Sequence, residues 1–175
     1  MNSASVIGLG NILCGDLGAG CHLIDALCQE ELGNDIELIF LGRDARYAGA
    51  FMMEKEFAVV VKAVSLGGVP GNICCWNLES FQRNLPWFCE LAECAGAFAR
   101  SLHWARFAGC FPREVLFVWI EPKITEGLGI SEEVRRAIRK VIRLIKTALA
   151  DRGLLADKAS TLPRIHYLDL LEMSL

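Results

Sequence analysis

The sequence VIGLGNILCGDLGAG, residues 6–20, begins with an apolar run and continues into a turn rich in glycine. A helical pattern of apolar residues follows in Leu23, Ile24 and Leu27. This order predicts a strand over residues 5–8, then a loop, then a helix. In open α/β sheets, ligands usually bind at the carboxyl ends of the strands. The loop is therefore the first candidate for a functional site.

The composition indicates one globular domain over residues 1–175. The chain is 53% hydrophobic and 22% charged, and it is long enough to bury its own core. Its net charge of −3 argues against nucleic acid as a partner. We find no leader peptide and no run of about 18 uncharged apolar residues, and so expect a cytoplasmic protein without a membrane span.

The eight cysteines contain no C-x-x-C pair, which argues against the usual zinc and thioredoxin motifs. We expect most of them to be buried apolar residues in a reducing compartment.

Strands and helices alternate along the rest of the chain. The sequence FAVVVKA at residues 57–63 is typical of a strand buried on both faces of a parallel sheet. Ser131 is expected to cap the last helix, with Glu132 and Glu133 favourable in its first turn. Further strands are predicted over residues 36–41, 72–78 and 114–120, and further helices over residues 19–32, 43–55 and 85–99. This pattern predicts a three-layer α/β fold, a twisted and mainly parallel sheet of about five strands with helices on both faces.

The glycine-rich loop also permits a dinucleotide-binding interpretation, because a G-x-G sequence follows the first strand. The full fingerprint needs a third glycine where Leu13 stands, and an acidic residue where the second predicted strand ends in Gly42 and Arg43. We keep this interpretation only as a distant alternative.

The same loop resembles the motif G-N-x-(L/M)-x-x-D-(E/D)-G-x-G of the [NiFe]-hydrogenase maturation peptidases. The matching residues are Gly10, Asn11, Leu13, Asp16, Gly18 and Gly20. Later segments resemble family motifs in the same order, at residues 60–63 with 68–71, 101–103, 112–115, 120–122 and 128–134. By these matches the chain is identified as a divergent member of that family.

The resemblance implies an endopeptidase that removes the C-terminal extension of a [NiFe]-hydrogenase large subunit after nickel insertion. In the family, two carboxylates and a histidine recognise the nickel of the client, and such ligands suit that metal. The two carboxylate positions are here Leu17 and Lys62, and only His103 remains, in a triplet expected to open a helix. The resemblance implies no cofactor of its own, and the large-subunit precursor as partner.

Two hypotheses follow. In the first, Asp16 and His103 are the catalytic residues of a rebuilt peptidase site, to which Glu121 could contribute. In the second, Asp16 only forms hydrogen bonds within the loop, and the protein binds a large subunit without cutting it.

Lys62 ends an apolar strand, where burying an ammonium group is costly. Its ammonium either takes over the metal position near His103, balanced by Asp16 or backbone carbonyls, or reaches solvent. The basic residues of the last helix lie opposite its apolar stripe, and we interpret them as a solvated face.

Overall fold

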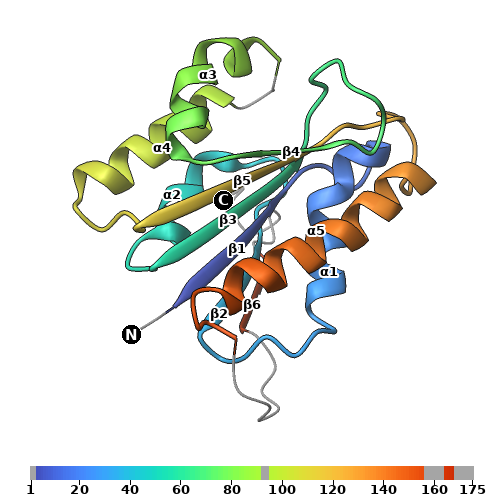
Figure 1. The fold of residues 1–175 in the computed structure, drawn as a ribbon. Helices are drawn as coiled ribbons and strands as arrows, with labels where there is room; N and C mark the ends of the chain where they lie inside the picture. Colours follow the sequence, from blue (N-terminus) through green and yellow to red (C-terminus); the bar gives the residue numbers. More distant parts are fainter. Residues whose placement is uncertain (1–2, 92–94, 156–163, 168–175) are drawn as a thin grey trace, which may run out of the picture.

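The computed structural model describes residues 3–91, 95–155 and 164–167. A six-stranded sheet forms the centre, in the order β4-β5-β3-β1-β2-β6 (Figure 1). All neighbouring strands are parallel except β4, which pairs antiparallel with β5 at one edge. The strands are β1 (Ala4–Leu9), β2 (Ile36–Phe40), β3 (Phe57–Ala63), β4 (Ile73–Trp76), β5 (Glu114–Ile120) and β6 (Arg164–Tyr167). The predicted fold is confirmed, and β6 is an additional strand that the sequence pattern does not predict.

Helices cover both faces of the sheet (Figure 1). One face carries α1 (Ala19–Leu27) and α5 (Glu132–Ala150), and the other carries α2 (Ala48–Met52), α3 (Leu78–Leu91) and α4 (Ala95–Phe107). Two short 3₁₀ helices, η1 (Gly15–Gly18) and η2 (Ala45–Tyr47), precede α1 and α2. None of the helices in the described ranges is long and apolar enough to cross a membrane.

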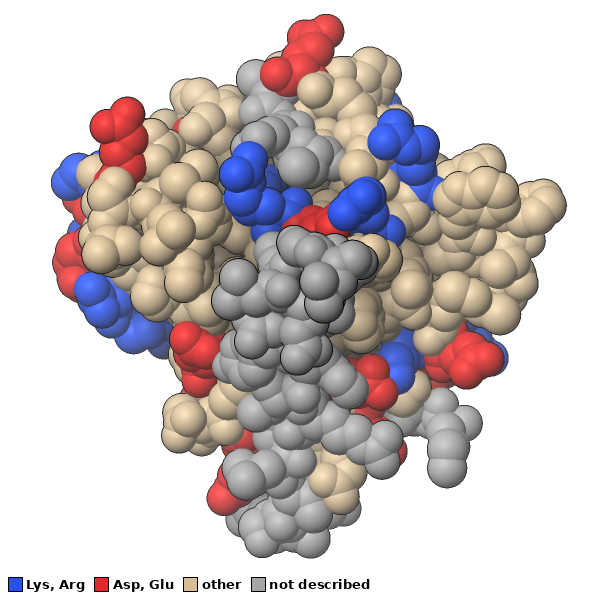
Figure 2. All heavy atoms as spheres, turned by 180° about the vertical axis from the view of Figure 1, so that it is seen from behind, with Lys and Arg blue, Asp and Glu red and all other residues tan. Residues whose placement is uncertain are grey.

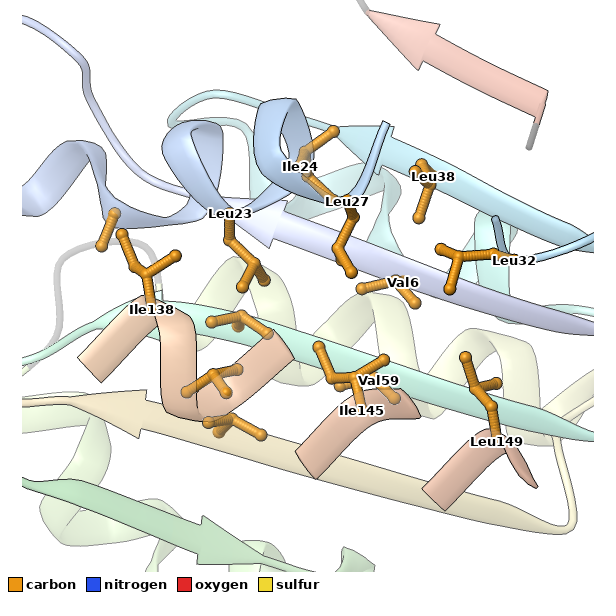
Figure 3. Packing of buried hydrophobic residues seen from close by; sticks show 14 of the residues in the cluster. Val6, Leu23, Ile24, Leu27, Leu32, Leu38, Val59, Ile138, Ile145 and Leu149 are labelled. Carbon is orange, nitrogen blue, oxygen red and sulfur yellow. The ribbon is translucent and has the colours of Figure 1, made fainter. Parts of the chain in front are cut away.

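A separate hydrophobic core lies on each face of the sheet. Along β3, Val59 and Val61 belong to the core under α1 and α5, whereas Ala58 and Val60 belong to the opposite core. This alternation is the ordinary period of a strand. Figure 3 shows the first core, in which α1 and α5 both pack onto β1 and β3.

The apolar stripe of α5 was predicted correctly. Its buried members are Val134, Ala137, Ile138, Val141, Ile145 and Leu149. Arg139 and Lys146, on the basic side, pair with Glu132 and Glu30. The interpretation of this side as a solvated face is confirmed.

The prediction of one helix over residues 85–99 is wrong, because two helices, α3 and α4, occupy this region. α3 begins much earlier, where the Asn77 side chain accepts a hydrogen bond from the Ser80 N–H, and it continues through Pro86. The predicted helix over residues 43–55 is reduced to η2 and α2, and the helix predicted over 19–32 ends at Leu27.

The prediction that residues 101–103 open a helix is also wrong, because they lie in the second half of α4. Ser101 has a different role there. Its buried hydroxyl donates to the Phe98 carbonyl at 2.9 Å and accepts the Gly49 N–H at 3.2 Å. Ser101 therefore fixes α4 against α2.

The expectation that most cysteines are buried is wrong for the part of the chain that the structure describes. Cys75 and Cys89 are exposed, and the other five are only partly buried, all as free thiols. They lie in the β1–α1 loop, in α1 and just after it, in the edge strand β4, in α3 and after α4, and none is enclosed by the two cores.

Candidate functional site

The loop between β1 and α1 follows a path that only glycine permits at several positions. A Cβ atom on Gly20 would lie 2.4 Å from the Leu9 carbonyl oxygen, and one on Gly8 would lie 2.4 Å from the Gly20 oxygen. Gly10 has a φ of +148°, and a Cβ there would meet the Leu17 oxygen at 1.9 Å. These contacts are far closer than van der Waals packing allows. The glycines of the motif are therefore required by backbone packing alone.

Asp16 fastens this loop to the loop between β5 and α5. Its fully buried carboxylate accepts hydrogen bonds from the backbone N–H groups of Lys123 at 2.7 Å, Ile124 at 2.9 Å and Ser131 at 2.6 Å. The Ser131 hydroxyl donates a fourth at 2.8 Å. In return, the Asp16 N–H donates to the Ile124 carbonyl at 2.8 Å. The two loops therefore form one rigid unit at the carboxyl edge of the sheet.

These bonds keep Asp16 ionised. Burial raises the pKa of the Asp16 carboxyl, but the hydrogen bonds from Ile124, Ser131 and Lys123 together lower it by more than burial raises it. The pKa of Asp16 therefore lies below its ordinary value. The loop hydrogen bonding predicted for Asp16 is present, and neither His103 nor Lys62 is among its partners.

Neither of the two family carboxylate positions provides an oxygen ligand. Leu17 is partly buried and packs against the core beneath α1 and α5. Lys62 is half-buried at the end of β3. By strand alternation, Lys62 belongs to the opposite face, that of Ala58 and Val60.

His103 lies in a different environment from the loop. Its side chain is exposed on α4 and lines a groove between α3 and α4, together with residues such as Phe81 and Leu102. The lining of this groove includes neither Leu17 nor Lys62. Among residues 3–91, 95–155 and 164–167, no three His, Cys, Asp or Glu side chains are arranged to hold a metal ion.

Glu121 has a structural role similar to that of Asp16. Its largely buried carboxylate accepts the Leu66 N–H at 2.9 Å, while its backbone carbonyl accepts the Gly71 N–H at 2.8 Å. Glu121 thus fastens the loop after β3 to the end of β5. The sequence suggested Glu121 only as an auxiliary carboxylate, and did not reveal Ser131 as the partner of Asp16.

Comparison with known proteins gives a consistent result. No family model matches the chain. The hydrogenase expression/formation protein HoxM of Azotobacter vinelandii is 26% identical over 163 residues, which cover 86% of this chain and 74% of HoxM. The hydrogenase maturating endopeptidase HybD from E. coli superposes with a TM-score of 0.77 at 23% identity, over 86% of this chain and 94% of HybD. The [NiFe] hydrogenase maturation protease HybD from Thermococcus kodakarensis superposes with a TM-score of 0.67 at 20% identity, over 83% of this chain and 98% of that protein.

The sheet order and the glycine-rich β1–α1 loop define an α/β protein with the maturation protease fold. At this distant level of identity, the chain is similar to the hydrogenase maturation proteases in sequence and shares their fold.

The residues at the family ligand positions predict weak metal binding. Isothermal titration of the protein with Ni²⁺ should give no tight stoichiometric binding, because Leu17 has no donor atom and Lys62 is cationic. The double variant Leu17→Glu with Lys62→Asp should bind Ni²⁺ at least about tenfold more tightly.

The control for this titration is His103→Ala. Since His103 lines the groove between α3 and α4, its removal should leave Ni²⁺ affinity unchanged in both backgrounds. Tight binding by the unmodified protein that disappears in His103→Ala would instead show that a metal site forms around this residue.

Proposed function

We propose that this protein acts in the maturation of a [NiFe]-hydrogenase by binding the large-subunit precursor without cutting it. The observation that carries the proposal is the state of Asp16. Asp16 is the carboxylate beside Leu17, which stands at the ligand position implied by the resemblance, and four hydrogen bonds already engage it. A peptidase directed by the nickel of its client needs carboxylates that are open to that metal.

The carboxyl edge of the sheet nevertheless has the surface of a binding site. Large apolar side chains extend into solvent from three loops there, with Leu13 64%, Val69 67% and Leu128 80% exposed. The bonds of Asp16 and Glu121 hold these loops in fixed positions. Exposed apolar side chains gathered on one edge are typical of protein interaction sites. An extended, apolar segment of the precursor is the ligand that fits such a surface.

Nickel enters this function only as part of the client. We propose that the protein needs no metal or cofactor of its own. We also place it in the cytoplasm, since free cysteines, including the exposed Cys75 and Cys89, suit a reducing compartment.

The test uses a nickel-loaded large-subunit precursor at equimolar ratio. Mass spectrometry should find its C-terminal extension intact after incubation, while size-exclusion chromatography detects a complex. The nickel-free precursor should bind equally well, because Leu17 and Lys62 offer no ligands to the metal. Specific removal of the extension would contradict the proposal and establish a rebuilt peptidase site.

A second arm of this test concerns the surface. The double variant Leu13→Ser with Leu128→Ser should weaken the complex about tenfold, since each loses an exposed apolar contact. The matched control is Arg143→Ser on the solvated side of α5, which should leave the complex intact. Equal binding by all three proteins would exclude the loop surface as the binding site.

A further inference from the structure

An open groove runs between α3 and α4, on the face of the sheet opposite α5. Its volume is about 490 Å³. The buried side chains Phe81 and Leu102 form part of its walls. The lining shared by the two helices includes Leu78, Phe81 and Leu85 from α3, and Ala99, Leu102 and Arg106 from α4.

The spacing of these residues matches the shape of a helix. In both helices the lining residues recur three or four positions apart and extend over seven, which corresponds to two helical turns. Two such ridges border a trough roughly 10 Å long, at about 1.5 Å per residue. The apolar face of a third helix packs into a trough of this kind by the ordinary fitting of ridges into grooves.

One end of the groove carries exposed aromatic side chains. Phe107 lines the groove and is 77% exposed. The ring of Trp104, itself 65% exposed, lies perpendicular to that of Phe107 with the centroids 5.8 Å apart. Aromatic side chains left in solvent at the edge of a cavity are typical anchors for a partner.

The α4 side of the groove is basic. Arg106 lines the groove, and Arg100 follows the lining residue Ala99 on a helix that contains no acidic residue. Neither arginine forms an ion pair with any residue that the structure describes. By contrast, Arg83 on α3 pairs with Glu79 at 2.6 Å. Seen from behind, the side of the molecule that carries α4 is mostly uncharged, with a few basic and acidic groups (Figure 2).

We propose that this groove binds an amphipathic, acidic helix of a protein partner. The apolar side chains of that helix lie between α3 and α4 and against Phe107, and its carboxylates pair with Arg100 and Arg106. Charge complementarity selects an acidic ligand over a basic one of the same shape. This inference does not depend on the proposed function, which uses the loops at the carboxyl edge of the sheet.

The experiment compares two labelled helical peptides of about 16 residues by fluorescence anisotropy. Both have leucine at positions i, i+3, i+4 and i+7, and they differ only in carrying Glu or Lys at the positions beside this stripe. The unmodified protein should bind the Glu peptide at least about tenfold more tightly than the Lys peptide.

Variants then locate the binding. Arg100→Glu with Arg106→Glu should reverse the preference between the peptides, and Phe107→Ser should weaken binding of the Glu peptide about tenfold. The matched control, Arg136→Glu with Lys140→Glu on α5, changes the net charge equally but should preserve the preference. No binding of the Glu peptide, equal binding of both peptides, or a reversal by the α5 variant would overturn the proposal. Circular dichroism checks that each variant is folded.

Discussion

Replacement of Asp16 by alanine should lower the free energy of unfolding by about 3 kcal/mol or more. The substitution leaves three part-buried backbone donors, on Lys123, Ile124 and Ser131, without their acceptor. It also disconnects the loop after β1 from the loop after β5. Urea denaturation followed by circular dichroism measures the effect. The exposed Asp35, whose side chain forms no hydrogen bond or ion pair with the residues that the structure describes, provides the control, and Asp35→Ala should change stability by less than about 0.5 kcal/mol.

The pH dependence of stability gives a second readout for Asp16. Its pKa is lowered in the folded protein from an ordinary value of 3.8. The ionised carboxylate therefore contributes its full stability above that value, and the contribution is lost as pH falls through the lowered pKa. The variant Asp16→Asn should be less stable than the unmodified protein at neutral pH and should lose less stability between neutral pH and about pH 3. Parallel pH profiles of the two proteins would contradict the role assigned to Asp16.

The central strands were predictable because of where they lie. β3 and β5 have the predicted bounds, since a strand covered on both faces is a continuous apolar run that ends sharply. α5 was equally clear, because Ser131 accepts the Val134 N–H as an N-cap and the apolar stripe has one period throughout. In such elements, local sequence and tertiary environment favour the same structure.

The region of α3 and α4 was not predictable in the same way. Proline usually ends or kinks a helix, whereas α3 continues through Pro86. The triplet at residues 101–103 was assigned to a ligand site by its resemblance alone. In the structure, Ser101 serves the contact between α2 and α4, and His103 faces the groove.

The partners within the site could not be inferred from local pattern either. Asp16 and Ser131 are 115 positions apart. Only the arrangement of the strands brings their two loops together. The sequence around Ser131 predicted a helix N-cap, and this role alone accounted for a serine at that position. The sequence shows that Leu17 has no donor atom for a metal, but its packing against the core beneath α1 and α5 required the structure.

Gly20→Ala should destabilise the protein by about 3 kcal/mol, because the new Cβ would lie 2.4 Å and 2.5 Å from the backbone oxygen and nitrogen of Leu9. Neither backbone atom can move without separating α1 from β1. The matched control is Gly96→Ala in α4, where the Cβ would meet only the Arg100 side chain, at 3.7 Å. That variant should gain up to about 1 kcal/mol, since alanine favours a helix.

Thermal and urea unfolding of the two glycine variants measure these opposite effects. If Gly20→Ala is as stable as the unmodified protein, the close packing of α1 on β1 is not what requires this glycine. The expected loss of stability would instead show that Gly20, one of the motif residues shared with the maturation peptidases, is required by the strand–loop–helix unit itself. A motif that is required for packing does not depend on metal ligands beside it, so the chain can keep this fold with Leu17 and Lys62 where the resemblance places the ligand carboxylates.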